Sequence, residues 1–508
     1  MRAHFLLFTL AFQVGVAVSE CNKAPHSHPA WQALFTSQID ASGGRGGIYD
    51  AGLFTPLETL DALSDSRFTT FGHPAFPRYS VRAKKTRFCD NTVNAYTGYI
   101  DIEARHLFFY FFESRGDPSK DDVIFWTNGG PGGSSSTGLL MELGPCRVTG
   151  DGEIKYHKES WNTNANLFFI DQPIGVGFSY ADYGETASTT EAAAKDVAAF
   201  VAIFFENFSQ FKGRAFHMAG ESYAGRYLPL FAAEVYDQNP WLAQNGLTPI
   251  HLTSIMIGNG MVDMFALVPS HYEMMCENAS LPPVISISEC VALKKLIPRC
   301  KKWMKAECVD HFDAVNCAAA TDFCGDSMGA AFASTGRNPY DMSRNCEGDT
   351  AESLCYPLAN NIAEYLSKPS IQTLLGVDPA VTGNFSVANM TVNAIFARNL
   401  DHLHPTSDHI SALLEHGVRV LVYVGSYDWI CNWVANERST LDLEWSGQSV
   451  FASQELREWK VGGRHAGVTR SAKGLTFASI YAAGHMTPYD KPVETLALIQ
   501  RWLTGVSL

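Results

Sequence analysis

The sequence is poor in charged residues and has no long basic tract. Only 18% of its 508 residues are Asp, Glu, Lys or Arg, and 38 basic residues against 52 acidic ones give a formal net charge of −14. Nucleic-acid binding relies on clustered Lys and Arg that neutralise phosphates, so the composition argues against a nucleic-acid partner. Hydrophobic residues make up 46% of the chain, which is enough to bury a core and excludes disorder as the main state.

Long apolar runs are missing beyond the N-terminus. After residue 19, no stretch reaches the roughly 18 apolar residues that a membrane-spanning helix needs, so we expect no membrane span. At the N-terminus itself, Arg2 precedes an apolar stretch, and Ala17-Val18-Ser19 has the small residues of a cleavage site. Residues 1–19 therefore predict a signal peptide. It would direct the protein into the secretory pathway, to be secreted or delivered to a vacuole or lysosome.

The twelve cysteines lack the spacing of metal ligands. The sequence has no C-x-x-C pair and no H-E-x-x-H motif, so we predict disulfides formed in an oxidising compartment, and neither a metal nor another cofactor. Four Asn-x-Ser/Thr triplets fit the same route and are candidate glycosylation sites. They are Asn207, Asn278, Asn384 and Asn389.

Residues 20–80 are rich in Gly, Ser, Pro and Thr and show no sustained periodicity. They predict a loosely structured leader or propeptide. The basic residues that follow, between Arg82 and Arg87, fit two interpretations, a processing site or the exposed edge of a strand.

From residue 97 onward, short apolar runs alternate with helical patterns. The runs of strand length are residues 106–112, 123–126, 167–170, 254–257, 418–424 and 476–482. Between them, residues 188–191 (Ser-Thr-Thr-Glu) form a capping box that predicts the start of a helix. Alternating strands and helices indicate an α/β fold with a mostly parallel central sheet flanked by helices.

Eight of the twelve cysteines fall between residues 262 and 397, where the strand pattern is weak. Many cysteines in a segment with few strands suggest an inserted subdomain that is crosslinked because its own core is small. We therefore assign residues 81–261 and 398–508 to the α/β core, and residues 262–397 to a cysteine-rich cap.

The segment from Gly220 to Ala224 (Gly-Glu-Ser-Tyr-Ala) follows an apolar run and precedes a helical pattern. This order is typical of a nucleophile elbow, in which Ser222 would stand at the carboxyl edge of the sheet. A serine nucleophile needs a base and an orienting carboxylate, which in this kind of fold follow at the ends of later strands. Asp428 and His485 occupy such positions, with Asp408 as the next candidate for the carboxylate.

A second glycine-rich segment, residues 126–135, also follows a predicted strand. Its glycines would let backbone N–H groups approach a substrate oxygen, which predicts one oxyanion donor here and another at the residue after Ser222. A phosphate-binding loop is the competing interpretation. It is disfavoured because the Walker lysine and the dinucleotide-binding spacing are both absent.

Six motifs stand in a fixed order along the chain. They are Asn128 to Gly132, Asp171 to Pro173 with Gly177 to Tyr180, Gly220 to Tyr227, Ile257 to Gly260, Cys431 to Trp433, and Gly484 to Met486. Together they resemble the serine carboxypeptidases, the group that contains carboxypeptidase Y and cathepsin A, over roughly residues 95–505. The resemblance implies an α/β-hydrolase fold with an inserted cap.

The resemblance also implies roles for the residues of the catalytic centre. Ser222 would be the nucleophile, His485 the general base and then acid, and Asp428 its orienting partner. The oxyanion hole would consist of the backbone N–H groups of Gly130 and Tyr223.

In the same family the substrate's terminal carboxylate is held by a Trp, an Asn and two Glu. These correspond here to Trp126, Asn128, Glu142 and Glu221. Two crowded carboxyl groups cannot both ionise cheaply, so one keeps a proton and can donate a hydrogen bond to the substrate carboxylate. We therefore expect peptidase activity to peak at acidic pH and substrate binding to weaken as the pH rises.

The sequence departs from the family at one position of the glycine-rich segment. Many relatives have a cysteine where Gly133 stands, and its disulfide to a cysteine beyond the insertion cannot form here. The loop would be looser, or held by another bridge. Cys431 corresponds to a cysteine that is unpaired near the active site of relatives.

The resulting prediction is a serine carboxypeptidase that releases C-terminal amino acids from peptides and proteins through an acyl-enzyme on Ser222. An acyltransferase that uses the same triad is the first alternative. A protective or binding protein that merely keeps the fold is the second. Relatives occur as monomers and dimers, so either state is expected.

Overall fold

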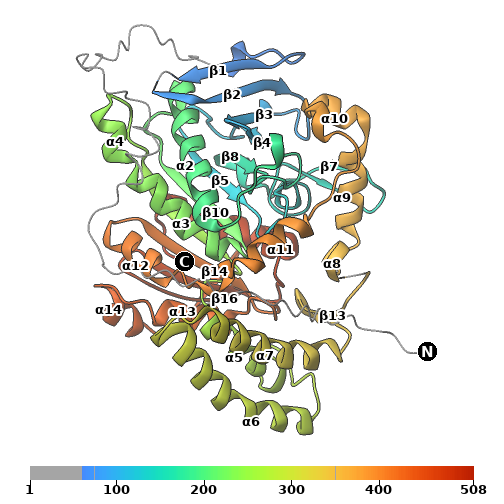
Figure 1. The fold of residues 1–508 in the computed structure, drawn as a ribbon, viewed down its shortest axis with the longest axis vertical. Coiled ribbons are helices and arrows are strands. Elements are labelled where there is room, and N and C mark those ends of the chain that lie inside the picture. Colours follow the sequence, from blue (N-terminus) through green and yellow to red (C-terminus); the bar gives the residue numbers. More distant parts are fainter. Residues whose placement is uncertain (1–59, 74, 349) are drawn as a thin grey trace, which may run out of the picture. The chain divides into compact units, whose positions relative to one another are not determined.

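The computed structural model describes residues 60–508 except residues 74 and 349 (Figure 1). The predicted signal peptide, most of the predicted leader and Cys21 lie outside these residues. The strands are Thr69–His73 (β1), Phe76–Thr86 (β2), Ala95–Ile102 (β3), Arg105–Phe112 (β4), Asp122–Thr127 (β5), Cys146–Val148 (β6), Ile154–Tyr156 (β7), Ala165–Ile170 (β8), Tyr180–Ala181 (β9), Phe216–Glu221 (β10), Leu252–Gly258 (β11), Arg337–Asn338 (β12), Asp341–Asn345 (β13), Arg419–Gly425 (β14), Arg457–Val461 (β15), Arg464–Ala472 (β16) and Leu475–Ile480 (β17).

Helices cover the sheet and build the insertion. The longer ones are Thr190–Asn207 (α2), Ala224–Asp237 (α3), Met264–Cys276 (α5), Ile287–Met304 (α6), Ala314–Ala333 (α7), Leu358–Ser367 (α9), Met390–Arg398 (α11), Ser407–Glu415 (α12), Trp433–Leu441 (α13) and Pro492–Thr504 (α16). The shorter ones are Asn239–Gln244 (α4), Thr350–Ser353 (α8), Pro369–Leu375 (α10), Gln448–Ala452 (α14), Thr487–Asp490 (α15) and the turn Gly138–Glu142 (η3).

The central sheet is mixed, with a parallel middle. Its order is β1-β2-β3-β4-β8-β5-β10-β11-β14-β17-β16-β15, and the neighbours from β8 to β17 pair in parallel. The strands on both flanks pair antiparallel. The predicted α/β fold is confirmed, whereas a mostly parallel sheet describes only the middle. Apolar runs identify buried strands but not the direction in which they pair.

Burial explains the central strands. Every residue of β8 and β10 is buried, as expected for strands covered on both faces. Helix α2 contributes Phe204, whose ring lies 4.4 Å from that of Phe168 on β8.

The N-cap of α2 is Thr189, whose side chain accepts a hydrogen bond from the Ala192 nitrogen. The helix therefore begins one residue later than the predicted capping box requires, and Glu191 does not complete the box.

The sheet begins at Thr69, and buried residues of the described core begin at Leu60, rather than at residue 81. Strand β1 and the first half of β2 lie within the predicted leader, and β2 pairs with β1 on one side and β3 on the other. The basic stretch therefore lies in an interior strand, which corrects both interpretations of it. Arg82 forms an ion pair with Asp101 at 2.7 Å, and Lys84 is buried and donates to the Leu374 carbonyl at 3.2 Å. A strand paired on both sides is a poor substrate for a processing protease.

The predicted cap contains two structurally different parts. In the first, α5, α6 and α7 pack on one another and group away from β1 and β2 in Figure 1. This part contains the disulfides Cys276–Cys290, Cys300–Cys324 and Cys308–Cys317, and a fourth, Cys346–Cys355, follows the β12–β13 hairpin. The second part, α9 and α10, packs on the main core through Ile362, Leu366 and Leu375. The boundaries 262–397 therefore include a segment that belongs to the core.

Candidate functional site

Ser222 stands in the turn between β10 and α3, as the predicted elbow requires. Its φ of 65° lies in the left-handed region, which is uncommon for a residue other than glycine and marks a sharp turn. A Cβ at Gly220 would lie 2.4 Å from the Thr127 carbonyl oxygen, so only glycine allows the strands to approach this closely. The turn is held by a 3.0 Å hydrogen bond from the Ser222 nitrogen to the Gly258 carbonyl.

Asp428 and His485 meet at the same edge of the sheet. Asp428 follows β14 and His485 follows β17, and these strands are parallel neighbours. His485 Nδ1 lies 2.7 Å from Asp428 Oδ2, and both side chains are buried. The backbone nitrogen of His485 donates a hydrogen bond to the Tyr340 carbonyl at 2.7 Å, which fixes the loop that carries the imidazole.

The Asp428 carboxylate is fixed by three further donors. Asn259 Nδ2 donates to Oδ2 at 2.8 Å, and the backbone nitrogens of Ile430 and Cys431 donate to the two oxygens at 3.0 and 3.3 Å. Asn259 was not predicted as a site residue. Its signal is its position between two glycines directly after the β11 run, where an Asn side chain can reach the neighbouring strand end.

Ser222 and His485 line one cavity of about 240 Å³ together with the glycine-rich segment. Gly129 and Gly130 form part of its wall. A Cβ at Gly129 would lie 2.3 Å from the Tyr223 nitrogen, so a side chain at that position would displace this N–H group. The cavity therefore brings a hydroxyl, an imidazole and the backbone of the glycine-rich segment to one place.

Two buried carboxyl groups lie beside this cavity. Asn128 Nδ2 donates to Glu221 Oε1 at 3.0 Å and to Glu142 Oε1 at 3.3 Å, while Asn128 Oδ1 accepts from Trp126 Nε1 at 2.8 Å. The exposed fraction is 0% for Glu142 and 4% for Glu221.

Burial raises the pKa of both carboxyl groups. The pKa of Glu221 lies well above its usual value, because burial is reinforced by the charge of Glu142 and by the hydrogen bond between the two carboxyls. Hydrogen bonds from Glu221 and Asn128 partly offset the effect of burial on Glu142. The raised pKa values favour the protonated form of one of the two carboxyl groups at acidic pH.

Of the four residues expected to hold the substrate carboxylate, only two face the cavity. Asn128 and Glu221 line it, whereas Glu142 and Trp126 lie fully buried behind them. Arg147 fixes the Glu142 turn, because its Nη2 donates to the carbonyls of Glu142 at 2.5 Å and Pro488 at 2.7 Å.

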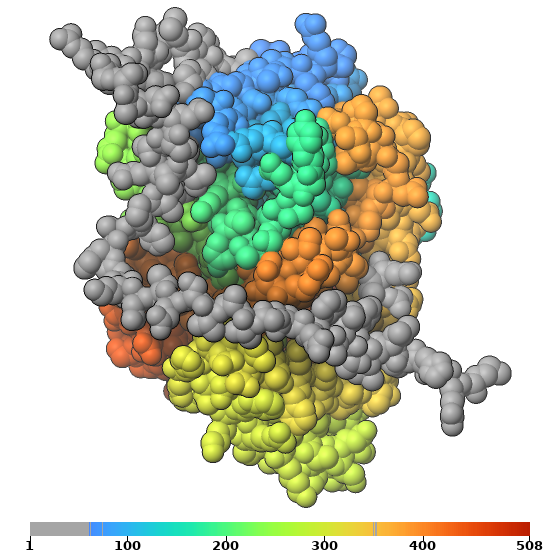
Figure 2. All heavy atoms as spheres, viewed as in Figure 1, coloured from blue at the N-terminus to red at the C-terminus, as the bar shows by residue number. Residues whose placement is uncertain are grey.

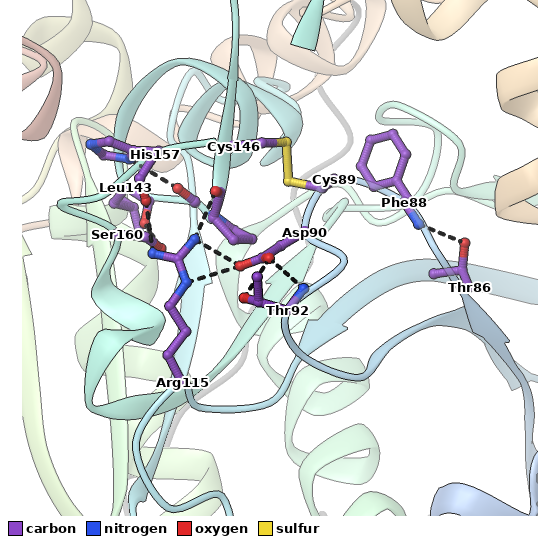
Figure 3. The surroundings of a disulfide bond; sticks show 12 residues. Thr86, Phe88, Cys89, Asp90, Thr92, Arg115, Leu143, Cys146, His157 and Ser160 are labelled. Carbon is purple, nitrogen blue, oxygen red and sulfur yellow. Dashed lines mark hydrogen bonds and ion pairs between the residues drawn. A yellow bond between two sulfur atoms is a disulfide. The ribbon is translucent and has the colours of Figure 1, made fainter. Parts of the chain in front are cut away.

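A disulfide anchors the same segment to the sheet (Figure 3). Cys146, four residues after Glu142, is bonded to Cys89, which follows β2. In the figure, Arg115 reaches from the neighbouring loop to Asp90, with an ion-pair distance of 2.7 Å, and to the His157 carbonyl at 2.7 Å. The turn that carries Glu142 is thus tied at its end by covalent and ionic contacts.

The glycine-rich loop is held by hydrogen bonds in place of the bridge that Gly133 precludes. The Ser134 nitrogen donates to the Val387 carbonyl and the Asn389 nitrogen to the Gly132 carbonyl, both at 2.8 Å. Asp171 accepts from Ser134 Oγ at 2.6 Å and from the Ser135 nitrogen at 3.1 Å. The loop is therefore neither loose nor disulfide-bonded, and Asp171 organises it without having been predicted to do so.

Cys431 is unpaired, as expected, while the ten other cysteines of residues 60–508 form five disulfides. Its thiol is buried, which raises its pKa well above the usual value, and it shares a hydrogen bond with the Ser222 side chain. An unpaired thiol therefore lies in contact with the hydroxyl of the elbow.

The four glycosylation candidates differ in exposure. Asn278 and Asn384 are exposed. Asn207 has an exposed fraction of 1%, and its Nδ2 donates to the Ile203 carbonyl at 2.9 Å, so the folded chain has no room for a glycan there. Asn389 is half-buried, and its amide caps α11 while donating to the Gly175 carbonyl. The burial of Asn207, the last residue of α2, therefore argues against a glycan there.

A serine in a strand-turn-helix elbow, followed by an acid and a histidine at the ends of later parallel strands, defines an α/β-hydrolase. The family model of the serine carboxypeptidases matches residues 87–505. Carboxypeptidase Y of Candida albicans is 39% identical over 84% of this chain and 77% of its own length. A vacuolar serine-type carboxypeptidase of Saccharomyces cerevisiae is 37% identical over 88% of this chain and 87% of its own.

A solved structure gives the same fold. The crystal structure of a prohormone-processing carboxypeptidase from Saccharomyces cerevisiae superposes with a TM-score of 0.70 at 23% identity, covering 83% of this chain and 95% of that one. The chain belongs to the serine carboxypeptidase family. It is therefore a peptide-bond hydrolase of the serine type. Within the described part of the chain, every helix is too short or too polar to cross a membrane.

Proposed function

We propose that the enzyme releases C-terminal amino acids through an acyl-enzyme on Ser222. The Ser222 hydroxyl attacks the last peptide carbonyl while His485 takes its proton, and His485 then gives this proton to the departing amine. A water molecule, activated by His485, hydrolyses the resulting ester. Asp428 orients the imidazole and stabilises its charged form.

The oxyanion of each tetrahedral intermediate is proposed to accept hydrogen bonds from the backbone N–H groups of Gly130 and Tyr223. Two features support this assignment. Gly130 lines the cavity that contains Ser222, and the backbone of Gly129 packs directly against the Tyr223 nitrogen.

The observation that carries the proposal is the buried carboxyl pair beside Ser222. A carboxyl group that keeps its proton can donate a hydrogen bond to the free carboxylate of a peptide, whereas an ionised one would repel it. In the proposed complex, Glu221 and Asn128 contact the substrate carboxylate. Glu142 and Trp126, which lie behind them, act as positioning residues.

The buried carboxyl pair, Glu142 and Glu221, predicts how KM changes with pH. As the pH rises, the pair loses its proton, a hydrogen-bond donor is lost and a second negative charge faces the substrate carboxylate. We therefore expect KM to rise with pH and the activity to peak in the acidic range. A KM for blocked dipeptides that stays constant from acidic to neutral pH would contradict this.

The test is release of the C-terminal amino acid from an N-blocked dipeptide at mildly acidic pH. Wild type should release it, Ser222→Ala should not, and the C-terminally amidated peptide should be a much poorer substrate. Glu221→Gln keeps a hydrogen-bond donor but cannot ionise, so its KM should depend less on pH than that of wild type. His465→Gln, on the outer strand β16, is a control that should leave the kinetics unchanged.

Two outcomes would redirect the proposal. If wild type released nothing while Ser222 still reacted with an organophosphate, the site would be intact and the acyltransferase interpretation would gain. If Ser222 failed to react in a folded protein, the binding-protein interpretation would gain.

We also propose a secretory route that ends in a vacuole or lysosome or outside the cell. Support comes from the predicted signal peptide and from the relative that is named vacuolar. Glycans are proposed at Asn278 and Asn384. Peptide mapping after enzymatic deglycosylation should find modified Asn278 and Asn384 and unmodified Asn207, and size measurement in solution should separate monomer from homodimer.

A further inference from the structure

One continuous segment, residues 387–401, contacts both walls of the proposed oxyanion site. It comprises the end of the predicted insertion, helix α11, and the turn that follows it. Met390 and Asn393 also line the cavity that contains Ser222. The contacts of this segment were not foreseen from the sequence, because they join parts of the chain that are far apart.

The start of the segment holds the glycine-rich loop. In addition to the two backbone hydrogen bonds described above, Asn393 Nδ2 donates to the Pro131 carbonyl at 3.1 Å. These contacts lie within four residues of Gly130, the first proposed oxyanion donor.

The end of the segment holds Tyr223, the second proposed donor. Asp401 Oδ2 accepts from the Tyr223 hydroxyl at 2.6 Å. Asp401 is itself fixed on all sides, because it accepts from the Thr190 nitrogen at 2.8 Å and the Thr190 hydroxyl at 2.6 Å, and Arg226 lies 3.5 Å away. Its exposed fraction is 1%, so these bonds form in a nonpolar interior where they are strong.

The middle of the segment joins the two ends. The ring of Phe396 lies 6.4 Å from that of Tyr223 and 6.3 Å from that of Tyr227, in edge-to-face geometry. Tyr223 and Tyr227 themselves pack at 5.0 Å. Tyr223, whose hydroxyl is bonded to Asp401, and Tyr227, on α3, are thus packed against the same phenylalanine.

We propose that residues 387–401 form a brace that sets the distance between the two oxyanion donors, with Asp401 as the positioning residue for Tyr223. This inference rests on the proposed function. Donors of an oxyanion hole stabilise the transition state only when they are held close to where the charge develops, and small displacements cost much of the rate. Gly133 rules out a disulfide at this loop, and the brace supplies the constraint through hydrogen bonds and ring packing.

The experiment compares Tyr223→Phe, Asp401→Asn and the double variant on an N-blocked dipeptide. Tyr223→Phe keeps the backbone N–H but loses the bond to Asp401. We expect kcat to fall about 10- to 100-fold in Tyr223→Phe, with KM changed less than about 3-fold. The kcat of the double variant should be no more than about 3-fold below that of the more impaired single variant. The reason is that both substitutions remove the same hydrogen bond, between Tyr223 and Asp401.

The affinity for a transition-state mimic tells whether Asp401 positions the oxyanion donor or only stabilises the fold. A peptide aldehyde forms a hemiacetal whose oxygen occupies the oxyanion position, so its inhibition constant should rise by about the same factor as kcat falls. Asp196→Asn is the matched control, because Asp196 is a buried carboxylate on α2 whose ion pair with Arg105 lies outside the brace. It should leave kcat and aldehyde affinity unchanged, even if thermal stability changes.

Each failure has its own signature. If wild type releases no amino acid, the proposed function fails. If wild type is active and Tyr223→Phe matches Asp196→Asn in kcat and aldehyde affinity, the brace is overturned. If Asp401→Asn does not fold, Tyr223→Phe alone decides, since it removes a single hydroxyl.

Discussion

The sheet core and the helices of the cap are stabilised in different ways. In the core, aromatic and aliphatic side chains from all central strands form one continuous buried cluster. In the cap, α5 to α7 enclose only small apolar clusters, and residues 276–355 carry four of the five disulfides of the described chain. Figure 2 shows the cap helices as the yellow-green part of the surface.

The cap also exposes more apolar surface. Of the thirteen large hydrophobic side chains exposed among the described residues, six lie between residues 287 and 323, including Ile287 at 85% and Val315 at 79%. A segment that buries little apolar surface gains little from the hydrophobic effect. Covalent crosslinks compensate by restricting the unfolded chain, which is why the cysteines concentrate there.

The largest expected effect is in the aromatic part of the core. Phe204 packs against Phe168, Phe111 and Phe208, with ring distances of 4.4, 5.5 and 4.8 Å. Phe204→Ala should reduce the free energy of unfolding by about 3–5 kcal/mol, because it leaves a cavity in a packed interior. Phe323→Ala, in the exposed part of α7, is the control and should cost under about 1 kcal/mol by the same urea titration. Equal losses of unfolding free energy in the two variants would contradict the proposed difference between core and cap.

Next in size is the loss of a cap disulfide. Replacing both Cys300 and Cys324 by Ala removes a crosslink that spans 24 residues and should cost about 2–4 kcal/mol. The loss should be local, so hydrogen exchange should accelerate in α6 and α7 while β10 and β11 keep their protection. Uniform acceleration throughout the sheet would show that the cap and the core unfold as one unit.

A smaller effect concerns buried carboxyl groups of the core. Burial raises the pKa of Asp171 to about 6 and of Asp196 to about 7, both above the values of an unfolded chain. The folded state then holds more protons, so this contribution is complete below about pH 4 and is lost as the pH rises through 6 to 7.

The melting temperature should therefore fall between pH 5 and pH 7.5. Over the same pH range the free energy of unfolding should decline by roughly 1–3 kcal/mol less in Asp196→Asn than in wild type. A decline that is as steep in Asp196→Asn as in wild type would show that other groups cause it.

The smallest effect is expected at the exposed apolar surface of the cap. Ile287→Ala, at the first residue of α6, should change the free energy of unfolding by less than about 0.5 kcal/mol. Leu293→Ala, on the buried face of the same helix, is the comparison and should cost about 2 kcal/mol or more. A large effect at Ile287 would mean that another surface covers it.

The site shows what sequence patterns can and cannot supply. Ser222, Asp428 and His485 could be placed together because each follows an apolar run, and the carboxyl ends of parallel strands meet at one edge. The pattern could not show that Asn128 and Glu221 face the cavity while Glu142 lies behind them. That difference depends on the packing of η3 against the sheet.

The errors have the same origin. Residues 69–80 were assigned to a leader because Gly, Pro and Ser obscure the strand pattern, although β1 and β2 extend the sheet. Asn207 was a glycosylation candidate because a triplet carries no information about burial. Residues 358–375 were placed in the cap because they directly follow the cysteine-rich stretch and precede the next predicted strand, whereas their apolar face packs on the core.

The sequence by itself determined the α/β class, the order of the serine, the aspartate and the histidine of the site, the family and the location of most disulfides, because these depend on local periodicity, residue spacing and composition. The tertiary structure alone decided the strand directions at the edges, the burial of Glu142 and Glu221 around Asn128, and the contact of Asp401 with Tyr223. Those features arise from side chains that lie up to 178 residues apart in the chain. Their pKa values and hydrogen bonds exist only once water has been excluded around them.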